Sequence, residues 1–287
     1  MYNLKLILIL INIIFSSISL YGNSDKILNL ANTLFSNKEY NTAITEYKRY
    51  YFFNPKSKYT PYIFSKIGDC YKYLKDYNNA LKYYILAQET YDDEEFYYKL
   101  SLKISIIYIL QQKFSKSEVK LLEIYNFSNN NKLKKESLFY LAIIEALQYN
   151  WEKSYNYLIK YFNNKDQTIL NLKKWRKELE LESLKNPLLA YYLSLVPGIG
   201  QIYSSNYKDF FAALGINSLN TYILFSFLQN KDLYGSIVFF ISTFLRYYTG
   251  NMMNAKNNSI KYNNKINKKN LKKLFNILDM SIIKNKN

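Results

Sequence analysis

The pattern of apolar and polar positions divides the chain near residues 186–207. Upstream of this junction the sequence is polar, rich in Tyr and Lys, and has the pattern of a helical region. Downstream lie two long apolar runs, 210–228 and 233–253, followed by a Lys-rich tail at 256–287. Runs of this length are near what a helix needs to cross a bilayer. We therefore expect an all-α protein made of a helical region and a small membrane region.

Within residues 25–162, small and large residues recur every 37 positions through four units. We expect each unit to be a helical hairpin, with small residues where its two helices approach closely and larger ones beside them. Turns are predicted at 36–38, 75–76, 112–113 and 149–150. The recurring residues are Ala31, Gly68, Ser105 and Ala142; Tyr40, Tyr77, Phe114 and Trp151; Ala43, Ala80, Ser117 and Ser154; and Tyr47, Tyr84, Leu121 and Leu158.

The first two units resemble the tetratricopeptide repeat family at Ala31, Leu34, Ala43, Tyr47 and Pro55, and at Gly68, Tyr71, Ala80, Tyr84 and Ala87. The period is three residues longer than the usual 34, and the last two units have Ser where the family has Ala. The resemblance implies a solenoid whose first helices line a concave groove that binds protein segments. The alternative is that these are ordinary solvated helix positions. The candidate groove residues are Asn32, Phe35, Tyr62, Asp69, Lys72, Tyr73 and Lys99.

Two segments flank the repeats, which we place at 23–165. Residues 1–22 have Lys5, an apolar stretch and then small residues, which is the pattern of a signal peptide, with an uncleaved anchor as the alternative. Residues 166–186 predict a helix with Ile169, Leu172 and Trp175 on one side and charges on the rest. We expect this helix to cap the open apolar end of the repeats and link them to the membrane region, although a partner-binding role is the alternative.

The membrane region, 187–255, begins with an apolar stretch that breaks at a Pro-Gly-x-Gly sequence, because Pro lacks an N–H and Gly accepts unusual backbone angles. It resembles a small bacterial membrane module that is found in envelope proteins, sometimes after tetratricopeptide repeats, and this implies a location but no reaction. The resemblance extends loosely to Ala255, Tyr262 and Asn263, whereas Ser205-Asn206 departs from it. The motif residues are Pro197, Gly198, Gly200, Gln201 and Tyr203.

The apolar runs contain polar residues, of which Asn217, Asn220 and Arg246 are the candidates for a role inside the membrane. In lipid they must face protein, water or headgroups. We favour hydrogen bonds between helices and an Arg246 that reaches the interface, over a transport pathway. If residues 23–186 are exported and the basic tail stays inside, the number of crossings is odd. Residues 188–203 would then be a short third span, with a re-entrant or interfacial segment as the alternative.

Charge and composition narrow the function. A net charge of +17 would by itself suggest a protein that binds nucleic acid. The tail alone, however, has nine Lys against Asp279, so much of the positive charge directly follows the apolar runs. We therefore expect anionic lipids as partners and no nucleic acid. Leu271, Leu274 and Leu278 predict a helix lying on the membrane surface, with a disordered tail as the alternative. The abundance of Asn, Lys, Ile and Tyr looks like AT-rich coding bias.

No residue pattern indicates catalysis. The chain has no His and a single Cys, Cys70, so we expect no metal site, no cofactor and no enzymatic activity. The sequence favours a scaffold in the bacterial envelope, in the inner membrane with its repeats exported, that binds a protein or peptide partner in its groove. A helical channel or transporter component is the alternative, and an enzyme ranks below both.

Overall fold

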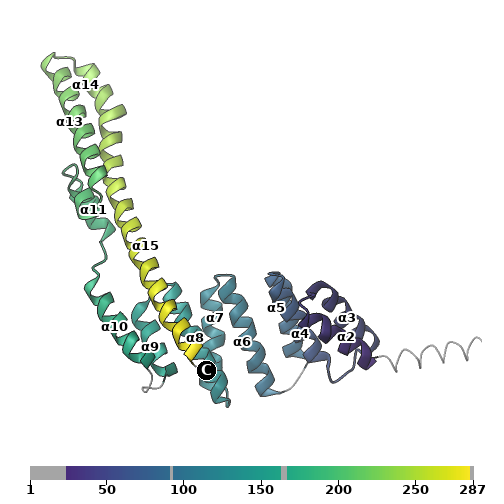
Figure 1. Ribbon diagram of the computed structural model, residues 1–287. Helices are drawn as coiled ribbons and strands as arrows, with labels where there is room; N and C mark the ends of the chain where they lie inside the picture. Colours follow the sequence, from purple (N-terminus) through teal and green to yellow (C-terminus); the bar gives the residue numbers. More distant parts are fainter. Residues whose placement is uncertain (1–23, 91–92, 163–166, 285–287) are drawn as a thin grey trace, which may run out of the picture. The chain divides into compact units, whose positions relative to one another are not determined.

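The computed structural model describes residues 24–90, 93–162 and 167–284, and these form helices joined by short turns (Figure 1). The expected signal peptide at 1–22 lies outside the described residues. The chain divides into two compact units, 1–163 and 164–287.

The described part of the first unit consists of four helical hairpins. Each helix contacts the next along the chain, and α6 also contacts α8. This arrangement confirms the predicted hairpins, including the third and fourth, whose sequences depart most from the family pattern. The helices are α2 (Ser24–Ser36), α3 (Tyr40–Phe53), α4 (Thr60–Tyr73), α5 (Tyr77–Glu89), α6 (Glu94–Leu110), α7 (Phe114–Phe127), α8 (Asn131–Leu147) and α9 (Trp151–Phe162).

The four hairpin turns share one way of ending the first helix. In the first turn, Lys38 has φ 66°, and the N–H of Glu39 donates to the carbonyl of Leu34 at 2.9 Å. This pattern is a Schellman motif, which satisfies carbonyls left over at a helix C-terminus. The equivalent positive-φ residues are Lys75, Gln112 and Tyr149. None of the four is Gly, the residue that adopts this conformation most easily, so these turns are held by their hydrogen bonds and by packing.

The repeated small residues are buried where the two helices of a hairpin meet. Ala43 and Ala80 are fully buried, as the sequence predicts. In the later hairpins a serine bridges the two helices: Ser117 Oγ donates to the carbonyl of Ser105, and Ser154 Oγ to that of Ala142, both at 2.9 Å. A serine therefore replaces Ala in these units without leaving a buried hydroxyl unpaired.

The second hairpin is packed most tightly at Gly68. A Cβ at this position would lie 2.6 Å from Cδ1 and Cε1 of Tyr84, which is far closer than van der Waals contact. The Tyr84 ring is fully buried, and its hydroxyl donates to Asp69 Oδ1 at 2.7 Å, so it is not free to move away. At the equivalent positions the first hairpin has Ala31 with Tyr47, whereas the later hairpins have Ser105 with Leu121 and Ala142 with Leu158, where the large residue is smaller than Tyr.

The second unit is organised around one long helix. Helix α15 contacts α10, α11, α12 and α13, and in Figure 1 it runs beside α13, α11 and α10 in turn. Helices α14, η1 and α15 follow one another directly, and η1 is a π-helical turn. The elements are α10 (Gln167–Leu181), α11 (Pro187–Leu193), α12 (Ile199–Tyr203), α13 (Tyr207–Gln229), α14 (Leu233–Phe239), η1 (Phe240–Phe244) and α15 (Leu245–Lys284).

The helix expected in the basic tail is present, because residues 256–284 belong to α15, and this helix packs against α10. Leu274 and Leu278 are buried. Lys269 Nζ and Asn270 Nδ2 each donate to the Glu182 carboxylate at 2.7 Å. Burial raises the pKa of Glu182, but these two hydrogen bonds outweigh it and hold that pKa below its usual value. The tail and the helix expected at 166–186 thus form one packed element.

In the described chain one helix, α13, is long and apolar enough to cross a membrane by its length and composition. Within its apolar window, 17% of α13 is buried in the protein. The other long apolar run, 233–253, is divided among α14, η1 and the start of α15. The expected short third span, 188–203, instead forms helices of 7 and 5 residues. Neither reaches the roughly 20 residues that a crossing takes.

We expect Gly68→Ala to destabilise the protein by about 1–3 kcal/mol through overpacking, only partly offset by the better helix propensity of Ala. Tyr84→Leu, which reproduces the later hairpins, should make the same change less costly. A double-mutant cycle on the full-length protein, followed by thermal unfolding and by hydrogen exchange in α4 and α5, measures this coupling. An equal cost of Gly68→Ala with and without Tyr84→Leu would contradict it.

Candidate functional site

The predicted groove residues lie on the first helices of three successive hairpins, α2, α4 and α6. The structure brings some of them together on α2 and α4. We call this group the aromatic–lysine cluster, and it consists of Phe35, Tyr62, Lys66, Lys72 and Tyr73.

The rings and ammonium groups of this cluster contact one another. Phe35 and Tyr73 lie 6.1 Å apart, edge to face, and Lys66 Nζ lies 4.3 Å from the centre of the Phe35 ring and 5.5 Å from that of Tyr62. Lys72 Nζ lies 4.6 Å from the centre of the Tyr73 ring. Tyr73 is 51% exposed and Tyr62 37%. The cluster therefore presents aromatic surface and positive charge to the outside of the repeat unit.

Asn32 and Asp69 occupy equivalent positions 37 residues apart, and both are engaged inside the repeats. Asn32 Oδ1 accepts hydrogen bonds from the hydroxyls of Tyr47 at 2.7 Å and Tyr62 at 3.2 Å. Asp69 is only 8% exposed, and it accepts from Tyr84 at 2.7 Å and from Lys103 Nζ at 2.7 Å. These two residues position the tyrosines of the hairpins, and little of Asp69 is left for a ligand.

Lys99 stands apart from the cluster on α6. Its Nζ lies 2.5 Å from Glu95 Oε1, one turn earlier on the same helix, and its side chain is 54% exposed. The hydrogen bond from Lys99 is the main cause that lowers the pKa of Glu95. An exposed pair of this kind contributes little to stability. The structure thus places this predicted groove residue in a surface ion pair.

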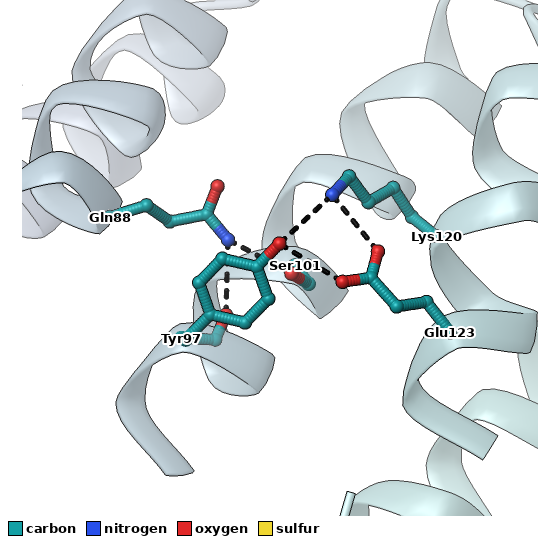
Figure 2. A network of polar contacts seen from close by, with 5 residues as sticks. All are labelled: Gln88, Tyr97, Ser101, Lys120 and Glu123. Atoms are coloured by element: carbon teal, nitrogen blue, oxygen red, sulfur yellow. Dashed lines mark hydrogen bonds and ion pairs between the residues drawn. The ribbon is translucent and has the colours of Figure 1, made fainter. Parts of the chain in front are cut away.

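A polar network that sequence reasoning missed links α5, α6 and α7 (Figure 2). Gln88 Nε2 donates to the carbonyl of Tyr97 at 3.1 Å and to Ser101 Oγ at 2.9 Å. The Tyr97 hydroxyl donates to Glu123 at 3.0 Å and accepts from Lys120 at 3.3 Å. Burial lowers the pKa of Lys120, but its bonds to Glu123 and Tyr97 raise it further than burial lowers it. All five residues are engaged with one another, so the network joins hairpins.

The Pro-Gly-x-Gly-Gln-x-Tyr motif contributes Pro197 and Gly198 to the turn after α11, and its other residues form α12. Gly198 has φ 95°, and a Cβ there would lie 2.6 Å from the Phe210 ring. At Gly200 a Cβ would lie 2.0 Å from Ser194 Oγ, 2.2 Å from the Ala190 carbonyl oxygen and 2.9 Å from the Ala255 Cβ. Both glycines are thus required by space, and Gly198 also by backbone conformation. Close approach at Gly200 brings α11, α12 and α15 together.

The two polar residues of the motif bind α15 and the segment before α11. Gln201 is fully buried, and its Nε2 donates to the carbonyl of Asn251 at 2.9 Å and to Asn251 Oδ1 at 2.5 Å. The Tyr203 hydroxyl accepts from the N–H of Asn186 at 2.9 Å. Lys185 Nζ lies 5.2 Å from the centre of the Tyr203 ring and 5.6 Å from that of Tyr262. The motif residues therefore connect α12 to α15 and to the segment before α11 within the second unit.

Polar residues of the long apolar helices gather around a cavity of about 390 Å³ between α13 and α15. Asn217 and Arg246 line it, together with Asp209, Asn251 and Asn254. Asn217 Nδ2 donates to the carbonyl of Ala213 at 2.7 Å, within its own helix. Asn220 is buried but does not line this cavity. The sequence pointed to Asn217 and Arg246, but it gave no sign that Asp209 would join them.

Asp209 is the anionic centre of this region. Its Oδ2 accepts three amide hydrogen bonds, from Asn206 at 2.9 Å, Asn254 at 2.9 Å and Asn258 at 2.7 Å. Charge-assisted hydrogen bonds of this kind are the strong ones. They hold the beginning of α13 against α15, and the only sequence signal for them is a set of Asn residues at helical spacing.

No protein-family model matches the chain, and no curated protein is similar to it. Among solved structures, the chain is similar to the apo form of RapI, with 16% sequence identity and a TM-score of 0.46. The similarity covers 86% of this chain and 65% of RapI, so this chain spans just under two thirds of that protein's length.

We expect Gly200→Ala to reduce the amount of folded protein sharply, because the Ala190 carbonyl cannot retreat unless α11 moves. Gly200→Val should be worse, and Pro197→Ala milder because it adds no bulk. Gly215→Ala is the matched control, since nothing lies within 4 Å of a Cβ there; it should be neutral or stabilising by up to about 1 kcal/mol. Immunoblots of membrane fractions and thermal unfolding provide the measurements. Similar levels for Gly200→Ala and Gly215→Ala would contradict the packing at Gly200.

Proposed function

We propose that this chain is a non-enzymatic scaffold, exported and anchored in a bacterial membrane, which holds a protein or peptide partner on the aromatic–lysine cluster. The observation that carries the proposal is the exposed pair Tyr62 and Tyr73 on α4, with half-buried Lys66 and Lys72 beside them and Phe35 of α2 packed against Tyr73 and Lys66. Exposed aromatic side chains that are held by their neighbours provide contact area at a low entropic cost, and such residues dominate the energetics of protein interfaces.

The charges of the cluster indicate which chemical groups the partner presents to it. Lys66 and Lys72 lie against aromatic faces, where an ammonium group is stabilised while its remaining N–H donors stay available. In the described chain no Asp or Glu forms an ion pair with either lysine. The surface therefore suits an extended peptide segment that combines carboxylates with an aromatic or aliphatic anchor.

A hairpin made of α13 and the α14–η1–α15 run supports the membrane anchor. Helix α13 has 23 residues, which corresponds to about 34 Å at 1.5 Å per residue and matches the bilayer core. Its exposed side chains include Phe211, Leu219, Tyr222 and Phe225. On this proposal α11 and α12 lie at the interface, where their polar groups are satisfied by α15.

The hairpin also bears on the orientation of the tail. In the last part of α15, Lys273 binds Glu178 on α10 and Lys269 binds Glu182 directly after it, and both glutamates precede the hairpin. A chain that crosses twice and then touches the segment before its first crossing has both ends on one side. We therefore place the tail on the same side as α10, in place of the inside location that the count of Lys residues favours. Lys261, Lys265, Lys268 and Lys272 remain exposed to meet anionic lipid there.

A channel or transporter component is the second candidate, because charged and amide side chains line the cavity between α13 and α15. A single hairpin does not enclose a pore, so this function requires several copies of the chain. Ion flux into liposomes that contain the purified protein would support it. Flux no greater than that of empty liposomes leaves the scaffold as the proposal.

We expect Tyr73→Ala and Lys72→Glu to weaken partner capture from native membranes about tenfold or more, in line with the loss of an interface hot spot. Both should leave the secondary structure intact. Lys58→Glu is the matched control, since it reverses a charge that lies over Tyr59, outside the cluster. Crosslinking, affinity capture and mass spectrometry give the partner, and circular dichroism reports folding. Equal capture by all three variants would reject the cluster as the binding surface.

A second test concerns the crossings. In a Cys70→Ser background, we expect an impermeant thiol reagent applied to spheroplasts to label Lys272→Cys in the tail and Lys58→Cys in the repeats, because both lie on the exported side. Asn230→Cys at the hairpin tip should be protected. Labelling of the repeat site with protection of the tail site would require an odd number of crossings. Labelling of the tip alone would place the repeats inside the cell.

A further inference from the structure

The cavity between α13 and α15 contains donors and an acceptor that the protein does not use. Asn251 lines the cavity and is 8% exposed, and its buried Nδ2 has no hydrogen-bond partner among the described residues. Burying an amide N–H without a hydrogen-bond acceptor costs free energy, so this group indicates a ligand that accepts its hydrogen bond.

Arg246 supplies positive charge to the same cavity. It forms no ion pair with any residue that the structure describes, although it lies within a long apolar helical run. Arginine occurs only at positions 49, 176 and 246 in a chain that otherwise uses lysine. A guanidinium presents a planar fork of N–H donors that matches the oxygens of a phosphate, which a lysine cannot do.

Asp209 supplies the opposite charge at the end of the cavity where α13 begins. Its Oδ2 is fully engaged by three asparagine amides, but no described residue donates to its Oδ1. The three amides also hold the carboxylate in one orientation. The cavity thus combines a fixed anion with a guanidinium and a spare amide N–H, and it suits a ligand that bears both charges.

We propose that this cavity binds a phosphoethanolamine group, with its phosphate on Arg246 and Asn251 Nδ2 and its ammonium on Asp209. The inference rests on the membrane anchoring proposed above for its favoured source, a phosphatidylethanolamine headgroup. The cavity lies near the end of α13 that would be at the membrane interface, where headgroups are found. A soluble phosphoethanolamine compound has the same chemistry, and the test separates the two.

The experiment uses the full-length protein, purified in detergent, with short-chain phosphatidylethanolamine, short-chain phosphatidylglycerol and free phosphoethanolamine as probes. We expect the first to bind best, and Arg246→Gln to weaken it about tenfold or more, as for the loss of charged hydrogen bonds. Asn251→Asp keeps the acceptor that Gln201 uses but replaces the spare N–H with a negative charge, so it should weaken binding as well. Lys208→Gln, outside the cavity, is the control.

The probes separate the outcomes. Equal binding of free phosphoethanolamine supports the cavity chemistry and assigns a soluble source. Equal binding of phosphatidylglycerol, no binding of any probe, or binding that Arg246→Gln and Asn251→Asp leave unchanged would overturn the proposal. If the wild-type chain is recovered outside the membrane, the anchoring fails, and titration with free phosphoethanolamine still decides the site. Native mass spectrometry of membrane-purified protein reports which lipid is retained.

Discussion

Asparagine amides along α15 hold the other segments of the second unit in place. Asn251 accepts from Gln201, Asn254 and Asn258 donate to Asp209, and Asn270 donates to Glu182. Asn263 pairs with the backbone of Lys185, accepting from its N–H and donating to its carbonyl, both at 2.8 Å. An amide group offers donors and an acceptor at one position, so one residue type can satisfy a peptide group, a carboxylate and another amide. These bonds require α15 to lie close to its neighbours, and the absence of a side chain at Gly200 permits that approach.

The repeat unit achieves the same closeness through different residues. Its helices meet at small side chains. Gly68 faces Tyr84, Ala31 belongs to a hairpin that also has Tyr at the equivalent position, and Ser105 and Ala142 belong to hairpins that have Leu there. The two tyrosines, Tyr47 and Tyr84, need polar partners for their buried hydroxyls. They find them in Asn32 and Asp69, one repeat apart.

The hairpins could be predicted because their determinants recur every 37 residues: small residues at contacts, large ones beside them and turn residues between. The cluster of Phe35, Tyr62 and Tyr73 could be predicted for the same reason, since helical position fixes the face. The position of Asp69 in the repeat does not distinguish it from the cluster residues, because what sets it apart is its hydrogen bonds to Tyr84 and Lys103. The bond between Asn263 and Lys185 joins residues 78 apart, outside any local pattern. Asparagine, whose abundance suggested only coding bias, forms most of the side-chain hydrogen bonds that connect α15 to other segments.

The contact between the end of α15 and α10 has a consequence for biosynthesis. Glu182 meets Lys269 and Asn270 only after a further 87 and 88 residues have been made. The repeat hairpins, whose contacts are local, can form before the last helix has been made. Helix α10 cannot make its contacts with α15 until that helix has been made. A nascent chain that stalls within α15 would therefore have a folded repeat unit followed by an incompletely packed second unit. Incompletely packed chains of this kind are what chaperones and proteases recognise.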